Sequence, residues 1–116
     1  MILPELSLNS ALADFVNITK NFYGDNLEKV ILFGSYARGD FSPESDVDVM
    51  ILLSMDDDDI QEHDPILAAY TYDFNDLHRT DIQPISLNYK QYEKWLTVHP
   101  FYANVSNEGI TLYEKQ

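Results

Sequence analysis

The amino-acid sequence predicts an α+β fold in which a small mixed β-sheet is flanked by helices. Two observations support this class. Short apolar runs rich in β-branched residues alternate along the chain with longer segments whose apolar residues recur every three or four positions. The 116 residues, 45% of them hydrophobic, are enough for one hydrophobic core and too few for two domains. We therefore expect a single domain over residues 1–116.

The first half of the chain is predicted to contain a helix, then two strands joined by a short helix and a loop. Residues 10–23 have the apolar spacing of an amphipathic helix and are followed by a glycine. The β-branched and aromatic run 29–33 indicates a buried strand. Residues 35–38 are expected to form the short helix, and 39–45 a loop rich in turn-forming residues. The run 46–53 is predicted to be a strand beside the first one, in a direction that the sequence leaves open.

The second half is predicted to contain a third strand between helices. Residues 54–63 are acidic and lack periodicity, so they are interpreted as a solvated connection. A helix is expected over about 65–77, with its proline in the first turn. The run 81–87 predicts the strand, and Pro84 within it indicates an edge of the sheet or a bulge. The remaining predicted elements are a helix at 89–96, a short helix from Pro100 and an extended segment at 110–113.

The chain is strongly acidic, with 20 aspartates and glutamates against 7 lysines and arginines, and a formal charge of −13. Such a surface repels phosphate backbones, so we expect no direct binding of nucleic acid, and instead a basic protein partner or divalent cations. The sequence has no cysteine, no signal-peptide pattern at its start and no apolar run of membrane-spanning length. We therefore expect a cytoplasmic protein that does not associate with membranes.

Two aspartates at the start of the second predicted strand are candidate metal ligands. Asp46 and Asp48 flank Val47, so their side chains point to the same face of the strand, with Cα atoms roughly 6 to 7 Å apart. Two carboxylates at this separation repel each other unless a cation lies between them. Oxygen ligands favour Mg²⁺, with Mn²⁺ as an alternative, and two such ions held by shared carboxylates are typical of nucleotidyl transfer.

Gly34 and Ser35, which follow the first predicted strand, form a candidate phosphate-binding loop. A glycine at a strand end lets the backbone approach a phosphate, and the start of the next helix offers unbonded N–H groups. The Ser35 hydroxyl can add a donor, and Arg38, one turn later, can reach a phosphate oxygen. A Gly-Ser turn or an Asp-x-Asp strand entry also occurs without function. The two together, in this strand context, indicate a nucleotidyltransferase site.

At these residues the chain resembles the DNA polymerase beta nucleotidyltransferase superfamily, and within it the minimal nucleotidyltransferase group. The similarity is carried by FGSYARG at 33–39 and SDVD at 45–48, and by the closing runs 99–102 and 108–113. The resemblance implies a nucleotidyltransferase-like fold, ATP as substrate and a third aspartate on a neighbouring strand, for which Asp81 is the candidate. In the family, this aspartate helps to hold one metal ion and activates the attacking hydroxyl group.

The resemblance also implies a partner, because the chain has no room for the helical domain with which larger relatives bind nucleotide and acceptor. Many minimal nucleotidyltransferases pair, as antitoxins, with HEPN-domain ribonuclease toxins. We therefore expect a hetero-oligomer in which this chain transfers AMP to a tyrosine of such a toxin. Two alternatives stay open: an antitoxin that neutralises its partner by binding alone, and nucleotidyl transfer to a small molecule.

Overall fold

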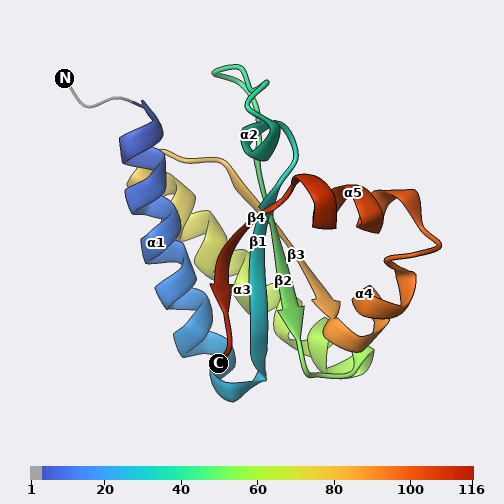
Figure 1. The fold of residues 1–116 in the computed structure, drawn as a ribbon. Helices are drawn as coiled ribbons and strands as arrows, with labels where there is room; N and C mark the ends of the chain where they lie inside the picture. Colours follow the sequence, from blue (N-terminus) through green and yellow to red (C-terminus); the bar gives the residue numbers. More distant parts are fainter. Residues whose placement is uncertain (1–3) are drawn as a thin grey trace.

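The computed structural model describes residues 4–116, and Figure 1 shows a β-sheet with helices on both of its faces. The strands are β1 (Leu27–Phe33), β2 (Val47–Leu53), β3 (Ile82–Asn88) and β4 (Ile110–Glu114). The helices are α1 (Pro4–Tyr23), the 3-10 turn η1 (Gly24–Asn26), α2 (Ser35–Arg38), α3 (Asp57–His78), α4 (Tyr89–Trp95) and α5 (Pro100–Glu108). This arrangement confirms the predicted α+β class with a small mixed sheet.

The order and direction of the strands decide which segments meet. The sheet runs β3-β2-β1-β4, with β1 antiparallel to both β2 and β4, and with β2 parallel to β3. The carboxyl end of β1 and the amino ends of β2 and β3 therefore lie together where these strands begin or end, at what we call the site edge of the sheet, beside α2 in Figure 1. In this register Phe33 is opposite Asp48, and Val47 is opposite Ile82.

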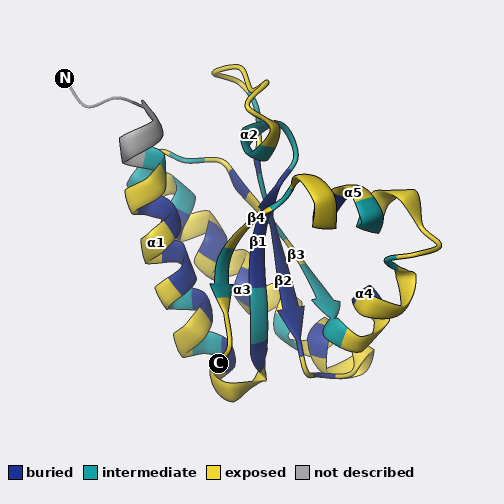
Figure 2. Cartoon of the chain, viewed as in Figure 1, coloured by how far each residue is buried: buried dark blue, intermediate teal, exposed yellow. Residues whose placement is uncertain are grey.

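Side chains alternate across the strands and build a hydrophobic core on each face of the sheet. In β2, Val47, Val49 and Ile51 pack with α1 and α3, whereas Met50 and Leu52 pack with α4 and α5. Figure 2 shows that the two central strands are mostly buried, while the outer sides of the helices are exposed. By the same alternation, the side chain of Asp48 projects from the face that α4 and α5 partly cover.

The strand β3 is the outermost strand on one side of the sheet, as Pro84 predicts for an edge strand. At its start, the Asn75 side chain takes the place of a neighbouring strand. Its Oδ1 accepts from the Ile82 N–H (2.9 Å) and from the Thr80 hydroxyl (2.8 Å), and its Nδ2 donates to the Ile82 carbonyl (3.0 Å). Pro84 has the same orientation in the strand as Ile82, so its missing N–H removes no bond to β2. The Asn75 bonds hold the chain on both sides of Asp81.

The prediction of a solvated connection at 54–63 is wrong, because α3 begins within this segment at Asp57. The Asp56 side chain caps the helix by accepting from the Asp59 N–H (2.9 Å), and an acidic first turn is favourable at the positive end of a helix. Pro65 consequently lies inside α3 rather than in its first turn. It is exposed, so water can bond to the carbonyl that the proline leaves without a partner.

The other elements lie close to their predicted positions, except that α1 begins at Pro4 rather than at Ser10. The additional turns carry Leu8, which packs against the core formed with α1 and α3, so burial extends the helix beyond its predicted start at Ser10. Within residues 4–116, none of these helices is both long enough and apolar enough to cross a membrane.

Candidate active site

One edge of the sheet brings together the segments that carry all the site residues predicted from the sequence. Asp48 is partly buried in β2, opposite the last residue of β1 and next to the Gly34–Ser35 loop. Asp46 is exposed just before β2. The Val47 N–H donates to the Asp81 carbonyl (2.9 Å), so the segments that carry Asp46 and Asp81 lie side by side. The fold thus places Asp48 against the loop, and Asp46 beside Asp81 at the same edge.

Gly34 is required both by its backbone conformation and by its neighbour. Its φ of 76° and ψ of −155° lie in a region that is essentially restricted to glycine. A Cβ at this position would overlap the carboxylate of Asp48. The sequence predicts only that this glycine admits a phosphate, whereas the structure shows that it also makes room for a candidate metal ligand.

The backbone amides after Gly34 form the candidate phosphate-binding group. The N–H groups of Ala37 and Arg38 both donate to the Gly34 carbonyl, at 3.1 Å each. Those of Ser35 and Tyr36 have no acceptor within the described part of the chain, as expected at the start of a helix. Because α2 has only 4 residues, any attraction for an anion comes from these local N–H groups rather than from a long helix dipole.

Arg38 lies at the end of α2 and is held by two carboxylates. Its Nε is 3.2 Å from Asp40 Oδ2, and its Nη1 is 3.6 Å from Glu108 Oε2 at the end of α5. All three side chains are at least 43% exposed. Ion pairs of this kind contribute only about 0.2 to 1 kcal/mol each. The guanidinium can therefore exchange a carboxylate for a phosphate oxygen at little cost in stability.

The carboxylates at this edge influence one another's ionisation. The pKa of Asp46 is raised above its ordinary value of 3.8, first by hydrogen bonding with the Asp81 carboxyl group and then by the charges of Asp81 and Asp48. The pKa of Asp48 is raised chiefly by burial and also by the charge of Asp81, while the nearby Arg38 lowers it. The charge of a neighbouring carboxylate contributes to both shifts, so negative charge accumulates where these aspartates meet.

This donor set fits a hard divalent cation such as Mg²⁺, because it consists of carboxylate oxygens at a point of excess negative charge. Among the side chains of the described residues, however, no group of three carboxylates or histidines is gathered closely enough to surround an ion. The three aspartates therefore interact along one edge of the sheet, and their side chains must converge further to share a metal ion.

Three neighbours of the site are not predicted from the sequence. Gln83 donates from Nε2 to Asp81 Oδ1 (2.8 Å), Glu108 pairs with Arg38, and Asn75 holds the start of β3. A signal existed for Gln83, because it follows Asp81 by two residues in a predicted strand and so shares its face. Asn75 and Glu108 had no such signal, since their contacts join separate elements.

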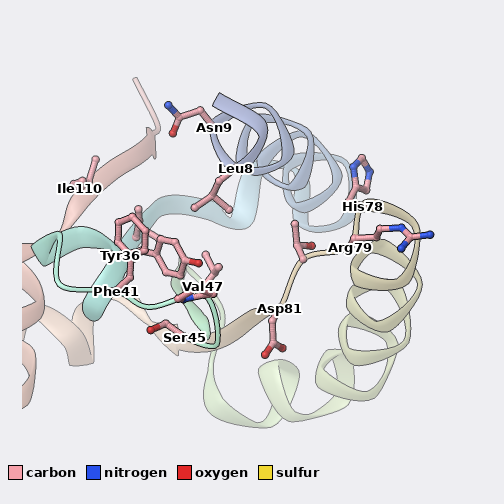
Figure 3. A pocket seen from close by; sticks show the side chains of 13 residues that line it. Leu8, Asn9, Tyr36, Phe41, Ser45, Val47, His78, Arg79, Asp81 and Ile110 are labelled. Carbon is pink, nitrogen blue, oxygen red and sulfur yellow. The ribbon is translucent and has the colours of Figure 1, made fainter. Parts of the chain in front are cut away.

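A pocket of about 490 Å³ opens beside this edge, among residues of α1, α2 and the segment after α3. Figure 3 shows Tyr36 and Phe41 on one side of the pocket, and His78 and Arg79 on the other. The two aromatic rings are stacked, with centroids 4.3 Å apart. Of the predicted site residues, Asp81 alone lines the pocket. The candidate active site is therefore bordered by a partly aromatic cavity.

Replacing Asp46 by Asn is expected to raise the melting temperature in the presence of EDTA. Asn can still bond to Asp81, while one of the repelling charges is removed. Because the pKa of Asp46 is raised in the folded protein, the repulsion is present above that pKa and disappears as the pH falls through it. The gain should therefore appear at neutral pH and vanish in acid, and salt should reduce it because Asp46 is exposed.

Differential scanning calorimetry with and without Mg²⁺ measures this effect. The wild-type protein should gain more stability from Mg²⁺ than Asp46→Asn does, since it keeps the full set of carboxylates. Asp14→Asn, at an exposed position on α1, is the matched control and should show neither change. Equal melting temperatures of wild type and Asp46→Asn in EDTA would contradict the repulsion.

Comparison with known proteins shows the family of the chain. A family model described as "Nucleotidyltransferase domain" matches residues 12–103, which include the loop and all three aspartates. A protein of Methanocaldococcus jannaschii named "Putative protein adenylyltransferase" is 50% identical over 48 residues, which cover 41% of this chain and 48% of that protein. The chain thus spans about half or less of the length of the curated relatives it matches.

Solved structures share the fold. A chain from a toxin–antitoxin complex with AMP-PNP aligns with a TM-score of 0.54 and 19% identity, covering 90% of this chain and 74% of that chain. A second chain comes from the complex of a tri-AMPylated HEPN toxin of Shewanella oneidensis with an MNT antitoxin. It aligns with a TM-score of 0.50 and 17% identity, covering 93% of this chain and 74% of that chain. At these identities the likeness shows the fold alone, and with the family match it confirms the predicted nucleotidyltransferase-like fold.

Proposed function

Because the chain belongs to the nucleotidyltransferase domain family, we propose that it transfers AMP from ATP to a hydroxyl group, with a tyrosine of a HEPN-domain toxin as the acceptor. The observation that carries this proposal is the packing of the Gly34–Ser35 loop against Asp48, at the edge that also holds Asp46 and Asp81. Relatives named as protein adenylyltransferases support AMP as the transferred group. A structural neighbour with AMP-PNP supports an adenine nucleotide.

The phosphates of the nucleotide would be bound by the loop. The backbone amides of Ser35 and Tyr36 and the Ser35 hydroxyl would donate to phosphate oxygens. Arg38 would give up one of its carboxylate partners and bind a further phosphate oxygen instead. Asp46, Asp48 and Asp81 would hold Mg²⁺, in two ions, with Mn²⁺ as an alternative. When bound, these ions neutralise the charge of the triphosphate and of the carboxylates.

Asp81 would act as the base toward the acceptor. Its carboxylate accepts the proton of the acceptor hydroxyl, whose oxygen forms a new bond to the α-phosphorus of ATP. The bond from that phosphorus to the bridging oxygen of the β-phosphate breaks, and pyrophosphate leaves with the electron pair. The role fits the position of Asp81, since it lies at the site edge and also lines the pocket.

A basic protein partner fits the charge of the chain. With a formal charge of −13, the protein would be attracted to a toxin that presents a positive face to RNA, and would itself be repelled by nucleic acid. We therefore propose a hetero-oligomer with the toxin, in the cytoplasm. In the solved complex named above, the toxin that accompanies an MNT antitoxin is tri-AMPylated, which supports this choice of partner.

Transfer of a labelled nucleotide tests the proposal. The purified protein is incubated with Mg²⁺, a purified HEPN-domain toxin, and ATP labelled on either the α- or the γ-phosphate. We expect label on the toxin from α-labelled ATP alone, at a tyrosine located by mass spectrometry, and no transfer in EDTA. Label from γ-labelled ATP would indicate a kinase, and turnover of a small-molecule panel without toxin labelling would indicate a different acceptor. Neutralisation of the toxin without any label would indicate an antitoxin that acts by binding alone.

A further inference from the structure

We propose that Gln83 is a positioning residue for Asp81: its side-chain amide fixes one oxygen of the Asp81 carboxylate and thereby directs the other toward the metal ions and the acceptor. This inference rests on the proposed function, because it assumes that Asp81 acts in nucleotidyl transfer. It adds a residue outside the predicted motifs, and one that carries no charge.

The contact itself is well defined. Gln83 Nε2 lies 2.8 Å from Asp81 Oδ1, and the two residues are separated by one position at the start of β3. In the parallel register of β2 and β3, Gln83 is paired with Asp48. Gln83 therefore lies beside two of the three carboxylates. Among the described residues, the Gln83 side chain makes its hydrogen bond to Asp81.

Repulsion between the carboxylates explains why a hydrogen bond from the Gln83 amide would matter. The Asp81 carboxyl group hydrogen-bonds with that of Asp46, and its charge also acts on Asp48. When all three groups are ionised, that bond has lost its proton, and repulsion between like charges favours rotation of the Asp81 carboxylate away from the other two. The terminal torsion of an aspartate is broad and does not by itself resist such a rotation. A neutral amide donor restrains the carboxylate without neutralising it, which leaves its charge available to a cation. A lysine or arginine at the same place would compete with the metal ions.

A purely structural role is separable from this one, because Gln83 is exposed. A hydrogen bond between exposed side chains contributes little to the free energy of unfolding, so its loss should leave the stability nearly unchanged. Residues that orient a metal ligand, by contrast, typically alter metal affinity or activity by about 10 to 100-fold when they are replaced. The two roles therefore predict different measurements.

The test compares Gln83→Leu and Gln83→Glu with the wild-type protein. Gln83→Leu should lower kcat for AMP transfer and weaken Mn²⁺ binding, measured by electron paramagnetic resonance, each by about 10-fold or more. Its KM for ATP and its urea midpoint should be unchanged, since the phosphate loop and the core are untouched. Gln83→Glu should lower kcat further, because it lacks the donor and adds a charge beside Asp48 and Asp81.

Two further variants make the outcome decisive. Gln91→Leu, at an exposed glutamine on α4, is the matched control and should behave as wild type in every assay. Asp81→Asn should be inactive. Wild-type kcat and Mn²⁺ affinity in Gln83→Leu, with Asp81→Asn inactive, would overturn the role of Gln83 and leave the proposed function standing. A fully active Asp81→Asn would overturn the proposed role of Asp81, and with it that of Gln83.

Discussion

Replacing Asp48 by Asn should lower the rate of AMP transfer by about 1000-fold or more while the fold is retained. Metal ions at a phosphoryl site contribute several kcal/mol to transition-state stabilisation, and about 4 kcal/mol corresponds to a factor of 1000 in rate. Asp48 is the carboxylate against which the phosphate loop packs, so its loss removes the candidate metal ligand that lies next to the phosphates. Asn has nearly the same shape and removes only the charge.

The stability of Asp48→Asn should equal or slightly exceed that of the wild type without metal. Burial raises the pKa of Asp48, so at pH values above that pKa its ionised form lowers the stability of the folded protein relative to the unfolded chain. Transfer is measured with α-labelled ATP at saturating ATP and acceptor, folding by circular dichroism, and toxin binding by titration calorimetry. Asp76→Asn, at an exposed position on α3, is the control and should be fully active. Undiminished transfer by Asp48→Asn would refute the proposed chemistry.

Replacing Gly34 by Ala should impair both stability and transfer. The backbone conformation of Gly34 is costly for any other residue, by about 1 to 3 kcal/mol. The added Cβ would also displace the Asp48 carboxylate, and a shift of about 1 Å in a reacting group can reduce a rate about 100-fold. We therefore expect a lower urea midpoint together with at least a 100-fold loss of kcat at a temperature where the variant is folded.

Gly24→Ala is a matched control for the backbone effect. Gly24 also has a positive φ, of 58°, but an added Cβ would meet no atom within 4 Å, and the residue lies in η1, at the opposite end of β1 from Gly34. It should lose about 1 kcal/mol of stability and keep its transfer rate. If Gly34→Ala lost stability but kept full activity, the contact between Gly34 and Asp48 would have no catalytic importance.

Much of the fold could be predicted because the relevant signals are local. The apolar runs mark the strands β1, β2 and β3, and Pro84 marks the edge position of β3, since a missing N–H is tolerated there. The start of α3 was missed because the acidic run that stabilises it has no apolar period. Its stabilising contacts, a cap from Asp56 and charges in the first turn, depend on the helix already being formed.

The sequence by itself determined which residues can carry the chemistry. Gly34–Ser35 falls where a predicted strand ends and a helix begins, which suits a phosphate-binding loop. Asp46 and Asp48 fall at the start of the next predicted strand, where the alternation of side chains places both on one face. Asp81 was identified through the family resemblance. The roles of these residues stay predictions, to be tested by the variants described above.

The tertiary structure decided how these residues meet. The antiparallel pairing of β1 with β2 and the parallel pairing of β2 with β3 place the phosphate loop and the three aspartates at one edge. Only this pairing shows that Gly34 makes room for Asp48, that Gln83 faces Asp48 while it holds Asp81, and that Glu108 reaches Arg38 from α5. These contacts join segments distant in sequence. Strand order and packing of the whole chain determine them, and no local pattern records that information.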